Sequence, residues 1–205
     1  QRNRASLMVG QRWNLDVTEP IDFESDWEPE LRQDMLARGE WGPRTGEDYI
    51  LSPRGFFKEI PPFAMGHSYM DGWLLFMARR RGAELIDATQ VVTAVHQNHS
   101  YAHIQKGPEG DVTDPQTKIN EELAGGGAHV LIMKDRTHVL TPGGLKPARD
   151  LWRLWRLIRT SLTLYPKLPF PIRVVLKAMN TAINGARTFL VFARIVAPNR
   201  GARYG

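Results

Sequence analysis

The feature that most constrains the fold of this chain is an apolar helix followed closely by a strand. Residues 73–81 are apolar on nearly every side until the three arginines at their end, so this helix should be largely buried. Asp71 stands where an N-cap would, and Gly82 stands where a helix would stop. Residues 85–88 are β-rich and follow that stop. A buried helix beside a buried strand indicates an α/β fold.

Similar signals predict further elements along the chain. The expected strands cover 5–10 with an extension to 17, 48–51, 91–95, and a hairpin of 129–133 with 137–140. The expected helices cover 28–39, one or two turns at 118–123, 149–162, and a segment that begins near residue 172. In the first of these helices, Leu31, Met35 and Leu36 should point toward the core.

Composition narrows the class of protein. A hydrophobic content of 42% over 205 residues is that of a globular protein with a real core. Cysteine is absent, which excludes disulfides and cysteine metal sites and permits a reducing compartment. No apolar run approaches the roughly 18 residues of a membrane span. Because the chain opens with Gln1 and without a secretory segment, we expect a cytoplasmic fragment of a longer protein.

Charge divides the chain into an acidic body and a basic end. Residues 145–205 carry 12 Lys or Arg against the single acid Asp150, whereas residues 1–144 carry 15 Lys or Arg against 21 Asp or Glu. Such a basic end predicts contact with something anionic, either a membrane surface or nucleic acid. We predict no nucleic-acid partner, because the basic end has neither aromatic stacking platforms nor a recognisable reading motif.

Both helices of the basic end are amphipathic. The apolar sides contain Leu151, Leu154, Trp155, Ile158 and Leu162 in the first helix, and Val175, Met179, Ile183, Ala186 and Leu190 in the second. The basic sides contain Arg149, Arg153 and Arg156, then Arg173, Lys177 and Arg187. These helices could lie in an anionic lipid interface, which would make the protein peripheral to the membrane. The alternative is that their apolar sides pack on the body of the protein.

Two polar features are candidates for a site. Backbone N–H groups and the helix dipole would stabilise Asp71 as an anion that can accept a proton, provided that a cleft exposes it; simple capping is the alternative. Alternation along a strand would point His96 and His99 to opposite faces, unless the chain turns after Gln97. We therefore expect one imidazole metal ligand completed by carboxylates elsewhere, with a structural role for each histidine as the alternative.

These residues resemble a known family. The order of an acidic residue, a buried helix, Gly82, the strand at 85–88 and then His96 resembles the C-terminal half of GT-A-fold glycosyltransferases, including polypeptide N-acetylgalactosaminyltransferases. In that family a Gly-Gly-Glu-Asn-like segment opens the helix, and a strand beyond it delivers a metal-binding histidine. Residues 7–145, roughly two thirds of the chain, also resemble family-A (family 2-like) glycosyltransferase-like proteins, in Val9-Gly10-Gln11-Arg12-Trp13, Ile86-Asp87-Ala88-Thr89 and His96-Gln97-Asn98-His99-Ser100-Tyr101.

The resemblance implies a mixed-sheet, GT-A-like portion over 1–145 and a basic helical extension over 146–205. It implies sugar transfer from a nucleotide-sugar donor to a hydroxyl of a glycan, lipid or protein acceptor. Asp71 would be the base at the acceptor hydroxyl, which favours inversion, and His96 would complete a Mn²⁺ or Mg²⁺ site on the donor diphosphate. The acceptor pocket would be shaped by Phe63, Tyr69 and Trp73, with a polar contact from His67.

Two departures from the family pattern limit this expectation. The family's acidic pair is reduced to Met70-Asp71, and the sequence contains no Asp-x-Asp. The nucleotide-binding half is therefore expected outside this chain, and the fragment alone is expected to be inactive. One alternative is a non-catalytic binding or scaffold module whose basic end docks on a membrane or partner. Another is a metal-dependent hydrolase, which needs His96, His99 and His103 on one face.

Overall fold

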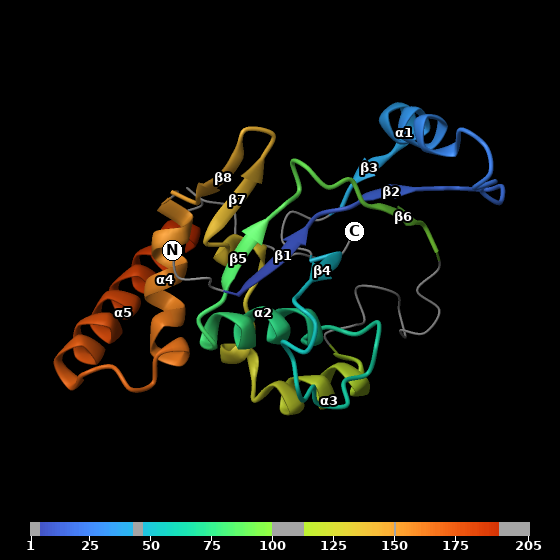
Figure 1. Ribbon diagram of the computed structural model, residues 1–205. Helices are drawn as coiled ribbons and strands as arrows, with labels where there is room; N and C mark the ends of the chain where they lie inside the picture. Colours follow the sequence, from blue (N-terminus) through green and yellow to red (C-terminus); the bar gives the residue numbers. More distant parts are fainter. Residues whose placement is uncertain (1–4, 43–46, 100–112, 150, 193–205) are drawn as a thin grey trace.

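The protein has a mixed α/β architecture, which confirms the expected fold class at that level. The computed structural model describes residues 5–42, 47–99, 113–149 and 151–192 (Figure 1). The strands are β1 (Ser6–Gly10), β2 (Trp13–Leu15), β3 (Glu40–Trp41), β4 (Tyr49–Leu51), β5 (Glu84–Asp87), β6 (Val95–Gln97), β7 (His138–Thr141) and β8 (Gly144–Pro147). The helices are α1 (Trp27–Arg38), α2 (Met70–Arg80), α3 (Pro115–Ala124), α4 (Leu151–Leu164) and α5 (Phe170–Phe192), with 3₁₀ turns η2 (Gly127–His129) and η3 (Met133–Asp135).

The strands form two sheets of mixed direction. The larger sheet has the order β4-β1-β5-β7-β8, in which β1, β5 and β7 are parallel and the two outer strands are antiparallel to their neighbours. The smaller sheet has the order β3-β2-β6. Only Gln11 and Arg12 separate β1 from β2, so the smaller sheet continues from the carboxyl end of β1 (Figure 1). Ligands of open α/β sheets bind at such carboxyl ends, so the junction of the two sheets is a candidate location for a binding site.

Helix α2 is largely buried in the core, as its apolar sequence predicts. Leu75 and Phe76 are buried against Leu7 and Leu85 from the two central strands. Gly72 allows a close approach at the start of the helix, because a Cβ there would lie 2.2 Å from Val130 Cγ1. Its carbonyl accepts a hydrogen bond from the backbone N–H of Leu131 at 3.0 Å. The first turn of α2 is therefore fixed against the segment that leads to η3.

Two features of α2 and α1 differ from the sequence expectation. The N-cap of α2 is Tyr69, so Asp71 lies inside the first turn and the alternative that it simply caps the helix was wrong. In α1, Met35 is buried as expected and Gly39 ends the helix, but Leu36 is 68% exposed. Helical spacing alone put Leu36 on the inward side, whereas α1 packs on β2 through a narrower stripe.

Two predicted β segments are turns. Residues 91–95 carry β-branched side chains, yet the N–H groups of Val91 and Val92 both donate to Ala88 O at 2.9 Å and close a turn before β6 begins. The proposed hairpin arm at 129–133 is replaced by η2 and η3, because the Asp135 carboxylate accepts from the N–H of Ile132 at 2.8 Å. The hairpin that does form pairs β7 with β8 around Pro142-Gly143. Local hydrogen bonding thus overrides β propensity at both places.

Helix α3 anchors the loop that leads into α2. It begins at Pro115, earlier than expected, because the Asp114 carboxylate accepts from the N–H of Gln116, and Gly125 ends it in the left-handed conformation. Asn120 is fully buried and holds the loop at both ends: its Oδ1 accepts from Ala64 N at 2.8 Å, and its Nδ2 donates to Ala64 O and Ser68 O at 3.0 Å. The position of the α2 start therefore depends on a side chain distant in the sequence.

Helix α4 packs on the body of the protein, which confirms the packing alternative for this helix. Arg156 was predicted on a solvated basic side, but it is buried and paired with Asp135. Its Nε donates to Asp135 Oδ1 at 2.7 Å, and its Nη2 contacts Asp135 Oδ2. Helix α5 packs on α4 at the end of the molecule away from the smaller sheet (Figure 1). No helix in the described residues is both long enough and apolar enough to cross a membrane.

Candidate active site

Three acidic side chains gather where β1 ends, and we call Glu47, Asp48 and Asp71 the acidic corner. Glu47 and Asp48 directly precede β4, and Asp71 lies in the first turn of α2. The negative charge of Asp48 raises the pKa of Asp71, and that of Asp71 raises the pKa of Glu47. The three charges are therefore close enough to influence one another.

Asp71 is the most exposed member of the acidic corner. It is exposed, yet partial burial of its carboxyl group and then the charge of Asp48 raise its pKa above the ordinary value. The backbone before it is strained, since Tyr69 has φ 89° and ψ −35°, a conformation that bulky residues rarely adopt. Such strain costs about 1–3 kcal/mol and tends to occur at functional sites. Asp71 thus has the accessibility and the raised pKa of a proton acceptor.

Glu47 lies deeper than Asp71. Burial is the main cause that raises the pKa of Glu47 well above its ordinary value, and the charges of Asp71, Asp135 and Asp48 add to it. The backbone N–H of Met133 donates to the carboxyl group and opposes this shift. Glu47 Oε1 is buried and has no hydrogen-bond partner among the described residues. Protonation of Glu47 removes both the cost of burying its negative charge and its repulsion from the neighbouring carboxylates.

Asp48 connects the acidic corner to Arg12 and, through it, to His96. Arg12 Nη1 donates to Asp48 Oδ1 at 2.6 Å, and burial raises the pKa of Asp48 in spite of this pairing. Beyond Arg12 lies β6, where burial and the positive charges of Arg12 and His99 lower the pKa of His96. The ion pair of Arg12 with Asp48 therefore influences Asp71 through Asp48 and His96 through Arg12.

The ring of Tyr49 packs over Gly10 at the end of β1. A Cβ at Gly10 would lie 1.9 Å from Tyr49 Oη, so only glycine permits the ring to lie where it does. Burial and the charge of Asp87 raise the pKa of Tyr49 to about 12. Oδ2 of Asp87 in turn lies 3.6 Å from Nε of Arg136. The tyrosine is thus a neutral structural element at physiological pH.

The aromatic residues predicted for the acceptor pocket lie beside α2. Phe63 and Trp73 are buried, with ring centroids 5.4 Å apart, and the half-buried Tyr69 packs against the same cluster. His67 Nδ1 lies 3.6 Å from Asp114 and 3.5 Å from Thr117 Oγ1, in a buried contact with the start of α3. Their substrate contacts remain predictions. Their observed packing supports the loop that carries Tyr69 and Asp71.

The chain turns after Gln97, which brings His96 and His99 together. Strand β6 ends at Gln97, and the ring centroids of the two histidines are 5.1 Å apart. The structure therefore has the turn that the sequence left as an alternative. His103 lies outside the described residues, so the three-histidine hydrolase arrangement stays untested.

His96 has properties of a metal ligand but has few companions. Its Nδ1 is buried without a hydrogen-bond partner in the described part of the chain, and the lowered pKa favours the neutral imidazole that a metal needs. Across residues 5–42, 47–99, 113–149 and 151–192, no three His, Asp or Glu side chains converge as a metal site. His96 thus fits one ligand position of a Mn²⁺ or Mg²⁺ ion whose remaining ligands these residues do not supply.

The sequence analysis missed Arg12, Glu47 and Asp48. The available signal was the pair of adjacent acids at the start of the predicted strand 48–51, since carboxylates at strand ends often face a site. Arg12 lay in a segment predicted as extended, and its pairing with Asp48 could not be read from spacing. Only the antiparallel pairing of β1 with β4 brings these residues together.

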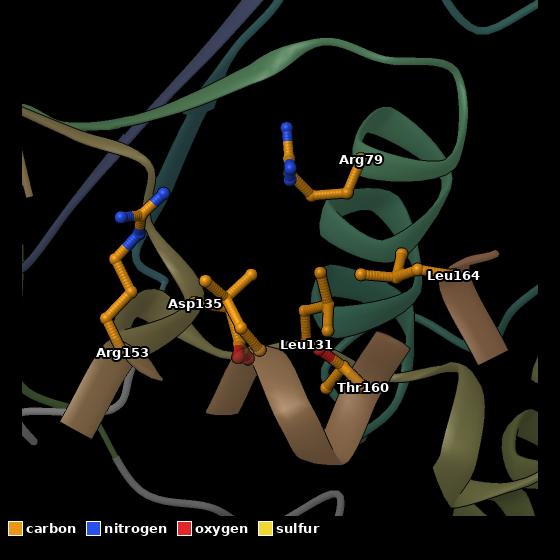
Figure 2. Close-up of a pocket in the computed structure, with 7 residues that line it drawn as sticks. Arg79, Leu131, Asp135, Arg153, Thr160 and Leu164 are labelled. Carbon is orange, nitrogen blue, oxygen red and sulfur yellow. The ribbon is translucent and has the colours of Figure 1, made fainter. Parts of the chain in front are cut away.

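A hollow lies between α2 and α4, away from the acidic corner. Figure 2 shows Arg79 of α2 facing Arg153, Thr160 and Leu164 of α4, with Leu131 and Asp135 between the two helices. Arg79 donates to Ala83 O at 2.6 Å and Arg153 donates to Ala148 O at 2.9 Å. Both arginines donate hydrogen bonds to backbone carbonyls, so we interpret this hollow as a small gap in the packing between α2 and α4.

Comparison with known proteins leaves the chain without an assigned family. No family model, no curated protein and no solved structure matches it. The likeness to GT-A glycosyltransferases therefore remains a prediction.

Replacing Glu47 by glutamine should stabilise the protein at neutral and alkaline pH. Because the pKa of Glu47 is raised in the folded state, folding retains a proton that the unfolded chain releases above about pH 4.3. Stability therefore falls as pH rises from that value toward the raised pKa. Thermal unfolding should show a Tm for Glu47→Gln about 2 °C or more above the parent at pH 8, and no difference near pH 4.

Glu59→Gln is the matched control for this experiment. Glu59 is exposed in the loop after β4, so its loss removes the same charge from solvent and should leave the pH profile of Tm unchanged. A Tm of Glu47→Gln at or below the parent at every pH would show that Glu47 is ionised and well solvated in the folded protein.

Proposed function

We propose that this chain is the acceptor-side portion of a nucleotide-sugar-dependent glycosyltransferase. The observation that carries the proposal is Asp71, an accessible carboxylate with a raised pKa, at a strained helix start beside the carboxyl end of β1. A general base needs accessibility and a pKa moved toward neutrality. The sequence resemblance supplies the reaction class, and the position of Asp71 suits it.

In this proposal Asp71 accepts the proton of an acceptor hydroxyl. The hydroxyl oxygen then forms a bond to the anomeric carbon of the donor sugar, while the bond from that carbon to the diphosphate breaks and the nucleoside diphosphate leaves. A base in line with attack favours inversion at the anomeric carbon. Burial and then the charge of Asp48 raise the pKa of Asp71, and the pairing of Asp48 with Arg12 holds Asp48 in place.

His96 has a separate role in the proposed site. Its neutral imidazole would be one ligand of Mn²⁺ or Mg²⁺, which when bound neutralises charge on the donor diphosphate. The Asp-x-Asp motif that would complete the site is absent from these residues. The proposed active enzyme is therefore the full-length gene product, with residues 1–145 contributing the acceptor side and with a cytoplasmic location.

The proposal is tested by incubating the full-length gene product with a panel of sugar nucleotides and Mn²⁺. We expect donor hydrolysis or transfer for at least one of them, with release of the nucleoside diphosphate measured by a coupled assay. A folded full-length protein that neither binds nor consumes any sugar nucleotide would overturn the proposal and favour the scaffold alternative.

A further inference from the structure

The start of α5 exposes large apolar side chains at the end of a helical hairpin. We call residues 165–177, which join α4 to α5 and form the first turns of α5, the hairpin tip. Phe170 is 80% exposed, and Ile172, Val174 and Val175 are between 46% and 56% exposed. The hairpin tip lies at the edge of the molecule, away from both sheets (Figure 1). Burial of such side chains is worth roughly 1.5–3 kcal/mol each, so this surface favours a partner.

The directions of these side chains indicate the kind of partner. Successive helical residues point about 100° apart, so Ile172 and Val175 lie about 60° apart on one side of α5, whereas Phe170 and Val174 lie about 40° apart on the other side. A single partner helix, or a membrane on which α5 lay flat, would need them on one side. Apolar side chains exposed on both sides of α5 can all be buried if this end of the helix enters an apolar medium that surrounds it.

The positive charge of the hairpin tip favours an anionic partner. Lys167, Arg173 and Lys177 are exposed, and residues 151–192 contain seven Lys or Arg and no Asp or Glu. A second copy of the chain would place these like charges against each other. Anionic lipid provides both an apolar interior for the apolar side chains and phosphates for the basic ones.

The hairpin tip is also held firmly by the rest of the molecule. The buried pair of Arg156 with Asp135 fixes α4 to η3, and α5 packs on α4. Insertion of the tip would therefore orient the whole protein relative to the membrane plane.

We propose that the hairpin tip inserts into the surface of an anionic lipid bilayer. Phe170, Ile172, Val174 and Val175 enter the boundary between headgroups and acyl chains, while Lys167, Arg173 and Lys177 contact lipid phosphates. This inference is more specific than two basic helices lying flat, because α4 stays on the protein and only the tip meets lipid. It does not rest on the proposed sugar transfer.

Vesicle flotation of the full chain tests this inference. The chain should float with vesicles of phosphatidylcholine mixed with phosphatidylglycerol, and not with phosphatidylcholine alone. Lys167→Gln/Arg173→Gln/Lys177→Gln should weaken partitioning about 100-fold at low salt, since each basic residue contributes about 1 kcal/mol. Phe170→Ser/Val174→Ser should weaken it at least about tenfold. Added salt should weaken binding of the parent.

The matched control is Ile60→Ser/Ile119→Ser. These two isoleucines are 50% and 46% exposed on the body of the protein, so their replacement should leave flotation unchanged. Equal binding to neutral vesicles, no binding to either kind, or full binding by both tip variants would overturn the inference. A concentration-dependent dimer in sedimentation that Phe170→Ser/Val174→Ser abolishes, without vesicle binding, would overturn it in favour of a second copy.

Discussion

Asp71→Asn in the full-length protein should lower the rate of sugar transfer by about 10²–10⁴-fold, the usual contribution of a general base. Asparagine keeps the shape of the side chain but cannot accept the proton of the acceptor hydroxyl. Binding of the donor should change little, because Asp71 is proposed to contact the acceptor. The measurement is kcat and donor KM for the parent and the variant with the sugar nucleotide that the panel identifies.

The pH profile distinguishes catalysis from a structural role of Asp71. Because the pKa of Asp71 is raised by burial and by Asp48, the acidic limb of the parent's kcat profile should lie above the ordinary range of aspartate, and Asp71→Asn should lose that limb. Glu30→Gln is the control, since Glu30 is also a first-turn acid, in α1. Glu30→Gln should cost about 0.3–1 kcal/mol of stability through the helix dipole and should leave the rate of transfer unchanged. Transfer at the parental rate by Asp71→Asn would remove Asp71 from the mechanism.

The elements that the sequence predicted correctly are those whose signals are local. Helix α2 and strand β5 follow from an apolar run, a glycine stop and β-rich residues that lie next to one another. The N-terminus of α2 was misplaced because it depends on Asn120, which bonds the preceding loop from another helix. Long-range hydrogen bonds of this kind leave no periodic trace in the sequence.

The candidate site was predictable only in part for the same reason. Asp71 and His96 could be singled out from their positions on a helix and near a strand. The raised pKa of Asp71 comes first from burial in the folded protein and then from the charge of Asp48, whose position is set by the pairing of β4 with β1 and by Arg12. Arg156 shows the converse error: helical spacing placed it on a solvated side, but Asp135 provides a buried partner.

Arg156→Met should destabilise the protein by about 3–5 kcal/mol, the largest stability effect that we expect from a single replacement. The change leaves the Asp135 carboxylate buried without its cationic partner, while Ile132 N still donates to it. Since 1 kcal/mol shifts Tm by about 2–4 °C for a chain of this size, Tm should fall by roughly 6–20 °C. Thermal and urea unfolding measure it.

Arg159→Met is the matched control, because Arg159 lies one turn further along α4 and is exposed. It stacks over Trp155 at 5.6 Å, a contact worth about 0.5–1 kcal/mol at an exposed site. A loss from Arg156→Met as small as that from Arg159→Met would contradict a buried ion pair.

The double replacement Asp135→Asn/Arg156→Met separates the ion pair from simple packing. Asparagine can still accept from Ile132 N, so the double variant should recover part of the stability lost in Arg156→Met. The effect should extend to Glu47, whose pKa is raised partly by the charge of Asp135. Without Arg156 that charge is no longer balanced, so the fall in stability between pH 5 and 8 should be steeper in Arg156→Met than in the parent, and shallower in the double variant. A pH dependence identical in all three proteins would show that Asp135 and Glu47 do not interact, and that α4 is attached to the body independently of the acidic corner.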